Sequence, residues 1–512
     1  MTEHTASGQP PVLPPLRGRF SSLGDALAAA ARQFGAREAY VDGGERIGFD
    51  AWHQQADSVA AEFAAWGLRR GDVLALMLPS GIAYAVAYAA AVRLGAVVTG
   101  LNTRLGPHET LAVLDRCRPA LVVRDENAGL PEVPAGPRLM TRATLESARY
   151  TGGRPRAFER VGPEDPAVII WSSGTTGTPK GAWYDHRGLE AAVHTAGVMS
   201  APFDRKLVAT PFAHAGYMAK VWDQLAWGTT LVVGGAPWRA AEMARTIAEE
   251  RITVVGGVPT QWAKLLELPD TGGAPWPHVR VGISATAPAP PELVRRVRDL
   301  LGVPLVVRYA MTESPSISGT DPQDSPETQF RTVGRPQQGV EVRVVDGAER
   351  TLPEGETGAV RVRGAGVMRG YWRDPDRTRS ALDVDGWLHT GDVGRFTPEG
   401  TLVLTGRSSD LYIRGGYNVH PLEVENVLSE HPLVGRVAVV GAPAPVIGEI
   451  GVAFVVPADA DRPPSLEALR EFTRAHLADY KAPDRVVVLA ALPLTPMLKV
   501  DRRALRVLAT TG

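Results

Sequence analysis

WSSGTTGTPKG, Trp171 to Gly181, directly follows the apolar run AVII. This segment is the strongest indication of fold and function in the sequence. Its small hydroxyl residues, placed between glycines, can surround a polyanion with backbone N–H groups and side-chain hydroxyls, and Lys180 adds a positive charge. The loop differs from a Walker A loop because Gly181, rather than Ser or Thr, follows the lysine. We therefore expect a phosphate-binding loop; the alternative is an ordinary Gly/Thr surface turn.

The residues before this loop alternate between helical and strand-like patterns from Phe20 to about Arg124. Such alternation predicts βαβ units and a largely parallel sheet. The longest uncharged stretch, Val73 to Val92, is about long enough to span a bilayer, but Pro79 and the two residues after it break it. We expect a buried strand, a turn and an Ala-rich helix ending near Arg93, and no membrane span.

The residues after the loop change character twice. Beyond Arg331 come the short β runs VEVRVV, AVRVRG and TLVLTG, which predict a small β-rich subdomain. A polar, glycine-rich boundary follows near residues 406–416. The rest of the chain alternates two helices with three strands, which predicts a small α+β domain. The expected division is a first domain over residues 1–408 and a second over 409–512.

Composition excludes several classes of protein. The chain has 512 residues, 44% of them hydrophobic, and 55 basic against 56 acidic residues. This balance excludes a disordered tail and a polybasic nucleic-acid binder. The single cysteine, Cys117, cannot form an internal disulfide, and the Pro-rich N-terminus with Glu3 does not resemble a secretory signal. We expect a cytoplasmic protein. Only six basic residues are lysines, and two of them, Lys180 and Lys499, fall in motifs.

The loop resembles the signature loop of the AMP-forming adenylating superfamily. This superfamily contains acyl- and aryl-CoA synthetases, peptide-synthetase adenylation domains and firefly-type luciferases. Four later segments resemble its other motifs in order: RYAMTES (308–314), DGWLHTGD (385–392), GRSSDLYIRGGYNVHPLEVE (406–425) and LPLTPMLKVDRRALR (492–506). The resemblance extends from about Leu23 onward. It implies an α/β fold, with a large N-terminal domain of stacked α/β layers and a small mobile C-terminal domain.

The resemblance also implies a reaction in two steps. A carboxylate attacks the α-phosphate of Mg-ATP and yields an acyl-adenylate and pyrophosphate. The thiol of CoA then attacks the acyl carbon and expels AMP. The expected cofactors are therefore ATP, Mg²⁺ and CoA, and the expected substrate is a small carboxylic acid.

Residues for the first step follow from the matching motifs. Lys499 would contact the carboxylate and the α-phosphate, although Leu498 stands where glycine is usual before this lysine. Glu313 would hold Mg²⁺, and Thr312 would bind the α-phosphate. The signature loop would surround the phosphates with Ser172, Ser173, Gly174, Thr175, Thr176, Gly177 and Lys180.

The resemblance implies a second group of residues for the adenosine. Tyr309 would stack on adenine, and the backbone of Ala285, Thr286 and Ala287 would form the other wall. Asp392 would accept hydrogen bonds from the ribose hydroxyls, and Arg407 would reach the same sugar.

Two features are implied for the second step. Ser409 matches the hinge about which the C-terminal domain would swing, where Asp or Lys is usual. Gly415 and Gly416 would line the tunnel for the pantetheine arm, because absent side chains leave room for it.

The acyl pocket follows from weaker similarity. His214 is the candidate gate beside the substrate carboxylate, and Ala215 follows it where amino-acid-activating relatives often have aspartate, which disfavours an α-amino acid substrate. Gln261 and Trp262 could suit an aromatic, cyclic or medium-length acyl group, or could pack inward. The expected walls are His214, Tyr217, Val258, Gln261, Ser284, Ala310 and Ser314.

Several alternatives stay open at this point. The activated group could pass to a carrier-protein thiol, an amine or another small nucleophile instead of CoA. A luciferase-type oxygenase would use the same first step. A regulatory nucleotide-binding protein without catalysis is disfavoured by the presence of Lys499, Glu313 and Asp392. A carrier-protein partner and a homodimer are compatible with the sequence.

Overall fold

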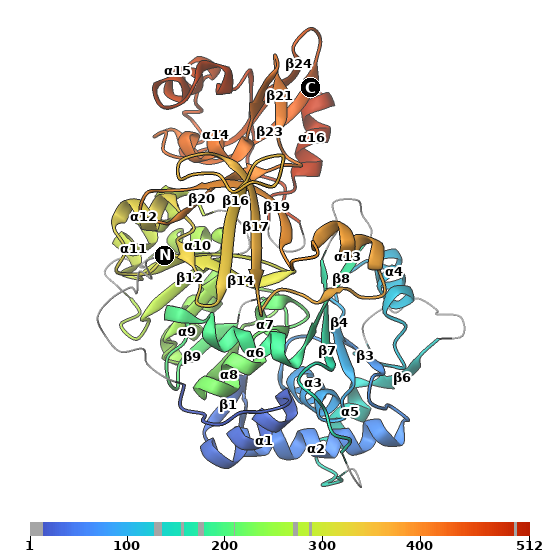
Figure 1. Ribbon diagram of the computed structural model, residues 1–512. Coiled ribbons are helices and arrows are strands. Elements are labelled where there is room, and N and C mark those ends of the chain that lie inside the picture. The colour runs from blue at the N-terminus through green and yellow to red at the C-terminus, as the bar shows by residue number, and fades with distance from the viewer. Residues whose placement is uncertain are drawn as a thin grey trace. The chain divides into compact units, whose positions relative to one another are not determined.

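The computed structural model describes residues 14–126, 136–154, 158–172, 179–208, 210–269, 275–285, 289–495 and 499–511. Figure 1 shows the backbone coloured by residue number. The chain divides into two compact units. The first comprises residues 1–179 and 183–233, and the second comprises residues 180–182 and 234–512.

The first unit contains a parallel sheet in the order β7-β4-β3-β5-β6, with β8 beside β7; residues 180–182, the first half of β8, are assigned to the second unit. These strands are β3 (Val73–Met77), β4 (Val97–Gly100), β5 (Leu121–Arg124), β6 (Arg138–Thr141), β7 (Pro166–Ser172) and β8 (Lys180–Asp185). The first unit also contributes four neighbouring strands to a different sheet. Of these, β9 (Arg205–Val208), β10 (Thr230–Val233) and β1 (Glu38–Asp42) are parallel, and β2 (Glu45–Gly48) is antiparallel to β1. The predicted largely parallel arrangement is confirmed.

The helices of the first unit connect these strands. They are α1 (Leu23–Phe34), α2 (Phe49–Ala65), α3 (Ile82–Arg93), α4 (Pro107–Cys117), α5 (Arg142–Ala148), α6 (His186–His194), α7 (Ala215–Met218) and α8 (Val221–Trp227), with a 3₁₀ turn at Gly197–Met199.

The uncharged stretch folds as predicted into a strand, a turn and a helix. All residues from Ile82 to Val92 in α3 are buried, because the helix packs against α2 and against strands of the first unit. Gly81 begins the helix at φ +156°, and a Cβ there would lie 2.4 Å from Asp42 Oδ2. That carboxylate instead accepts a hydrogen bond from Ile82 N at 3.2 Å. Asp42 therefore caps a helix far from it in sequence.

The second unit begins with the parallel strands β11 (Val254–Gly257), β12 (Val281–Ala285) and β13 (Leu305–Met311). Strands β14 (Ser314–Gly319) and β15 (Arg335–Pro336) continue this sheet in antiparallel pairing. The accompanying helices are α9 (Ala240–Glu249), α10 (Pro259–Leu266), α11 (Pro291–Leu301) and α12 (Pro326–Arg331). The turn between β13 and β14 carries Thr312 and Glu313.

The predicted β-rich subdomain is also present in the second unit. Four antiparallel strands follow in the order β16 (Val340–Val345), β17 (Gly358–Gly364), β19 (Leu388–Phe396) and β20 (Leu402–Arg407). The short strand β18 (Gly370–Tyr371) and helix α13 (Pro375–Ala381) lie between β17 and β19 in the chain.

The C-terminal part of the chain forms the expected small α+β structure. Its sheet has the order β22-β21-β24-β23, and β25 pairs in parallel with β24. Its elements are β21 (Tyr412–Arg414), β22 (Tyr417–Val419), α14 (Pro421–Leu428), β23 (Val434–Ala444), β24 (Gly448–Pro457), α15 (Leu466–His476), β25 (Arg485–Val488) and α16 (Arg502–Thr511), with a 3₁₀ turn at Asp479–Lys481.

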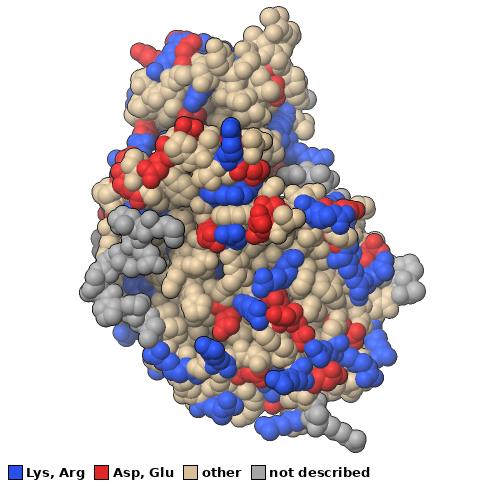
Figure 2. Space-filling model, in the orientation of Figure 1, with Lys and Arg blue, Asp and Glu red and all other residues tan. Residues whose placement is uncertain are grey.

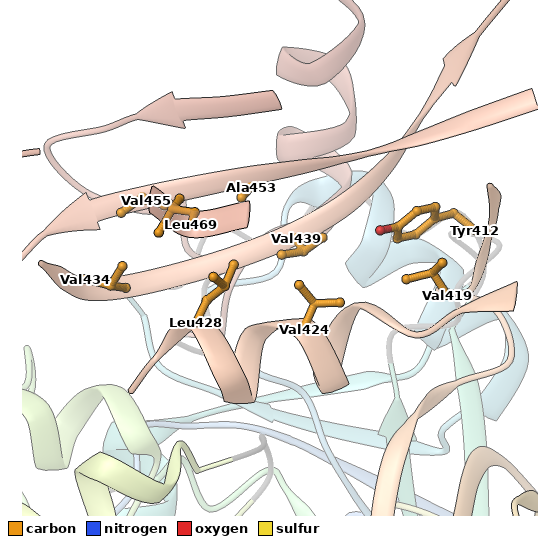
Figure 3. Packing of buried hydrophobic residues seen from close by; sticks show 9 residues of the cluster. All are labelled: Tyr412, Val419, Val424, Leu428, Val434, Val439, Ala453, Val455 and Leu469. Atoms are coloured by element: carbon orange, nitrogen blue, oxygen red, sulfur yellow. The ribbon is translucent and has the colours of Figure 1, made fainter. Parts of the chain in front are cut away.

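Two hydrophobic cores stabilise this C-terminal sheet, one on each face, because side chains alternate along a strand. Val439 and Val455 pack with Leu428 of α14 and Leu469 of α15 (Figure 3). Side chains on the other face of the sheet, such as Phe454, pack with Leu505 and Ala509 of α16. Figure 1 shows α14 and α15 on one side of the sheet and α16 on the other.

Figure 2 shows acidic and basic side chains interspersed over the visible face. Within the ranges that the structure describes, no helix has the length and apolar character needed to cross a membrane.

Candidate active site

Lys180, Tyr371 and Glu313 lie together in the second unit. Lys180 begins β8, and the neighbouring Gly181 carbonyl accepts a hydrogen bond from Trp372 N at 2.7 Å, which aligns β8 with the end of β18. Lys180 Nζ lies 5.5 Å from the centroid of the Tyr371 ring. The Tyr371 hydroxyl donates to Glu313 Oε1 at 2.8 Å. A cation, an aromatic ring and a carboxylate are therefore held in one row.

The environment of the Tyr371 hydroxyl keeps it protonated. Burial, and then the neighbouring Glu313 carboxylate, raise the pKa of Tyr371, so its hydroxyl stays a hydrogen-bond donor. The Glu313 residue is only 7% exposed, and its backbone carbonyl accepts a bond from Met368 N at 2.9 Å. The carboxylate is thus fixed at both its backbone and its side chain.

Glu313 fits a Mg²⁺ site in which phosphates supply most of the ligands. No group of three or more His, Cys, Asp or Glu side chains suited to a metal occurs among the described residues. Mg²⁺ keeps several waters and commonly binds through one or two carboxylates together with substrate phosphates. A single fixed carboxylate satisfies this requirement.

Asp392, Tyr309 and Arg407 form a second cluster in the same unit. Asp392 on β19 is paired in register with Arg407 on β20. Its Oδ1 accepts a bond from Arg407 Nε at 2.9 Å, and its Oδ2 accepts a bond from the Tyr309 hydroxyl. Burial, and then the Asp392 carboxylate, raise the pKa of Tyr309. Each oxygen of Asp392 keeps acceptor capacity for a further donor.

Lys499 lies in the segment before α16. The backbone of Thr495 and Lys499 is joined by a bond from Thr495 N to Lys499 O at 2.7 Å. Burial, and then the positive charge of Arg407, lower the pKa of Lys499 from its ordinary value of 10.5. No ion pair joins Lys499 to any residue that the structure describes, so its ammonium is available for an anionic ligand.

His214 is placed in the first unit at the start of α7. Its Nε2 lies 3.0 Å from Asn102 Nδ2, so the amide donates to the ring. The nearby predicted pocket residue Tyr217 is buried, stacks on Phe212 with 3.7 Å between ring centroids, and shares a 2.9 Å hydrogen bond with the Tyr40 hydroxyl. Tyr217 is therefore anchored by its hydroxyl, and it can offer a ligand only its ring.

Several expected acyl-pocket residues of the second unit have structural partners. Gln261 Oε1 accepts a bond from Val258 N at 3.0 Å and so caps the start of α10. Trp262 Nε1 donates to Ile283 O at 3.0 Å. Ser284 is fully buried, and its hydroxyl has no partner among the described residues.

The remaining expected residues fall into two groups. Ser172 ends β7, Ala285 ends β12, Ala310 lies in β13 and Ser314 begins β14. Gly415 and Gly416 form the turn between β21 and β22 at φ +56° and +86°. Outside the described residues lie Ser173, Gly174, Thr175, Thr176, Gly177, Thr286, Ala287 and Leu498.

Two contacts of this site were not predicted from the sequence. Tyr371 and Asn102 each hold a predicted residue, Glu313 and His214 respectively. Neither stands in a segment that the sequence motifs singled out. Their partners come from elsewhere in the chain, so no local pattern marks them.

Comparisons with known proteins identify the family of this chain. The family model described as AMP-binding enzyme matches residues 27–372, and the model described as AMP-binding enzyme C-terminal domain matches residues 423–499. A methyl-dioxo-octahydroindenyl-propanoyl:CoA ligase of Rhodococcus jostii is 33% identical, over 94% of this chain and 97% of that protein. A feruloyl-CoA synthase of an Amycolatopsis species is 32% identical, over 95% of this chain and 99% of that protein.

A solved structure shows the same fold. It is an amide bond synthetase from Marinactinospora thermotolerans, which is 29% identical to this chain with a TM-score of 0.83, over 96% of this chain and 100% of that one. The matches confirm the resemblance inferred from the five motifs. This chain belongs to the family of AMP-binding enzymes.

Proposed function

We propose that this protein is an AMP-forming carboxylate–CoA ligase, an acyl- or aryl-CoA synthetase that acts in the cytoplasm on a small carboxylic acid. The observation that carries the proposal is the row of Lys180, Tyr371 and Glu313, which brings a cation and a fixed carboxylate together within the second unit. Membership in the family and the two CoA ligases among its relatives support the same reaction.

In the first step a substrate carboxylate oxygen bonds to the α-phosphorus of ATP, and pyrophosphate leaves. Two anions approach each other, so the site must neutralise charge and align the reactants. Lys499 contacts the carboxylate and the α-phosphate, and Lys180 and Thr175 bind the departing phosphates. Bound Mg²⁺, held by Glu313, supplies further neutralisation of the phosphates. Thr312 and the residues Ser172, Ser173, Gly174, Thr176 and Gly177 complete the phosphate contacts.

The adenosine is held by the second cluster. Asp392 accepts hydrogen bonds from the ribose hydroxyls through the acceptor capacity left by Tyr309 and Arg407. Because the Tyr309 hydroxyl is tied to Asp392, its ring is oriented for adenine before the nucleotide arrives. The backbone at Ala285, Thr286 and Ala287 forms the opposite wall.

In the second step the CoA sulfur bonds to the acyl carbon, and the bond to AMP breaks. The proposed C-terminal domain, residues 409–512, rotates about Ser409 to remove Lys499 and to present Gly415 and Gly416 to the pantetheine arm. His214, oriented by Asn102, gates the approach to the acyl carbon.

The substrate is proposed to be an aromatic, cyclic or medium-length acid rather than an α-amino acid. Ala215 lacks a carboxylate to bind an α-amine. Within the second unit, the proposed walls of the acyl pocket are Val258, Gln261, Ser284, Ala310 and Ser314. In the first unit, Tyr217 remains a candidate acyl contact.

A second candidate acceptor is an amine, because an amide bond synthetase shares the fold over nearly the full length of this chain. The test incubates the protein with Mg-ATP, a carboxylate panel and either CoA or an amine, and identifies products by mass. CoA thioester with equimolar AMP is the expected result. Amide formation without thioester would replace CoA by an amine as the acceptor.

A further inference from the structure

The chain around Ser409 is tied down on both sides. On one side, Ser408 donates to Gly391 O through its backbone N at 3.0 Å and through its hydroxyl at 3.1 Å. On the other side, Asp410 Oδ1 accepts a bond from Arg506 Nη2 at 3.0 Å. A backbone hydrogen bond of the turn, from Asp410 N to Arg407 O at 3.1 Å, spans Ser409. Ser409 is therefore a joint one residue long, and within this turn it is spanned by one hydrogen bond.

The anchor of Asp410 is helix α16. Arg506 and Arg502 are four residues apart, so both project from the same face of this helix. Arg502 Nε lies 3.8 Å from Asp410 Oδ2, while its other nitrogens donate to Glu425 Oε2 at 2.7 Å and to Val439 O at 2.8 Å. Asp410 is thus attached to a helix that is itself fixed to α14 and β23.

The same helix fixes the position of Lys499. Asp501 Oδ1 accepts a bond from Ala504 N at 3.0 Å and caps the start of α16, and Asp501 N donates to Pro493 O at 2.8 Å. Lys499 itself is paired with Thr495 through both its backbone carbonyl and its N–H. A continuous set of short contacts therefore runs from Asp410 through α16 to the backbone of Lys499.

We infer that Arg506 is a positioning residue for the adenylation step. Through Asp410 it couples rotation at Ser409 to the placement of Lys499, so that turning one residue moves the lysine as part of a rigid body. The inference rests on the proposed function, because it assumes that Lys499 serves the first step and withdraws for the second. The coupling matters for the step that uses Lys499 and not for the attack of a thiol on a preformed acyl-adenylate.

The test compares Arg506→Gln with the unmodified protein in the two separate half-reactions. Carboxylate-dependent ATP–pyrophosphate exchange reports the first, and thioester formation from CoA and a supplied acyl-adenylate reports the second. We expect exchange to fall about tenfold, because small displacements of a catalytic group carry large rate costs, and thioester formation to change by less than about twofold. Asp410→Asn should reproduce this pattern, and Arg506→Lys should restore exchange.

Arg503→Gln is the matched control, because Arg503 lies on the same helix, is exposed, and forms no ion pair within the described part of the chain. Arg502 is avoided, since its loss would leave Glu425 without its cation. Equal loss of both half-reactions in Arg506→Gln, or unchanged exchange, would overturn the inference. Absence of exchange in the unmodified protein would instead overturn the proposed function, and the inference with it.

Discussion

Tyr371→Phe tests whether the Glu313 carboxylate must be held by a neighbouring hydroxyl. The change removes one hydrogen bond of 2.8 Å to a carboxylate that is 7% exposed, and it leaves the aromatic ring beside Lys180. A hydrogen bond to a charged group contributes about 1.5–3 kcal/mol, which corresponds to roughly a 10- to 150-fold loss of adenylation rate. The expected loss should be larger at low Mg²⁺, because a loosened carboxylate binds the metal less well.

The assay is carboxylate-dependent ATP–pyrophosphate exchange at several Mg²⁺ concentrations, with thermal unfolding measured in parallel. Tyr84→Phe is the matched control: Tyr84 is also buried, but its hydroxyl has no partner among the described residues, so its removal should leave exchange nearly unchanged. Wild-type exchange in Tyr371→Phe at every Mg²⁺ concentration would refute the reasoning.

Three further predictions concern the loop, the lysine and the thiol tunnel. Lys180→Ala should slow exchange about a hundredfold without unfolding the protein, whereas the exposed Lys264→Ala should not; an unchanged rate would show that Lys180 is dispensable. Burial and Arg407 lower the pKa of Lys499, and adenylation uses the charged form of this lysine. ATP–pyrophosphate exchange should therefore fall as the pH rises through a pKa below 10.5. In Lys499→Arg, any residual exchange should lack this decline at alkaline pH. Gly416 has φ +86°, and a Cβ added there would have no atom within 4 Å. Gly416→Ala should therefore lower the free energy of unfolding by about 1 kcal/mol through backbone strain, and should slow thioester formation more than exchange. Equal effects on both steps would argue against a tunnel there.

The elements with local signals were predictable from the sequence. The run Val73–Met77, the break after it and the buried helix Ile82–Arg93 follow from apolar patterning and from Pro79. The three β runs after Arg331 became β16, β17 and β20. In each case neighbouring residues in sequence determine the structure.

Contacts between distant segments were not predictable in this way. The sequence analysis does not predict helix α16, although Leu505 and Ala509 have helical spacing, because the motif around Lys499 indicates a catalytic lysine and not a secondary structure. The bond from Arg506 to Asp410 joins residues 96 positions apart, and the bond from Tyr371 to Glu313 joins residues 58 apart. Only the folded backbone brings such side chains together. The role of Gln261 as a helix cap likewise required the observed start of α10.

The most direct test of the account is ATP–pyrophosphate exchange across fatty, cyclic and aromatic carboxylates, in the unmodified protein and in Lys499→Ala. The account predicts exchange with at least one carboxylate, its loss in the variant, and continued attack of CoA on a supplied acyl-adenylate by that variant. No exchange with any carboxylate would contradict the proposed activation. Equal loss of both steps in Lys499→Ala would contradict the assignment of the lysine to the first step alone.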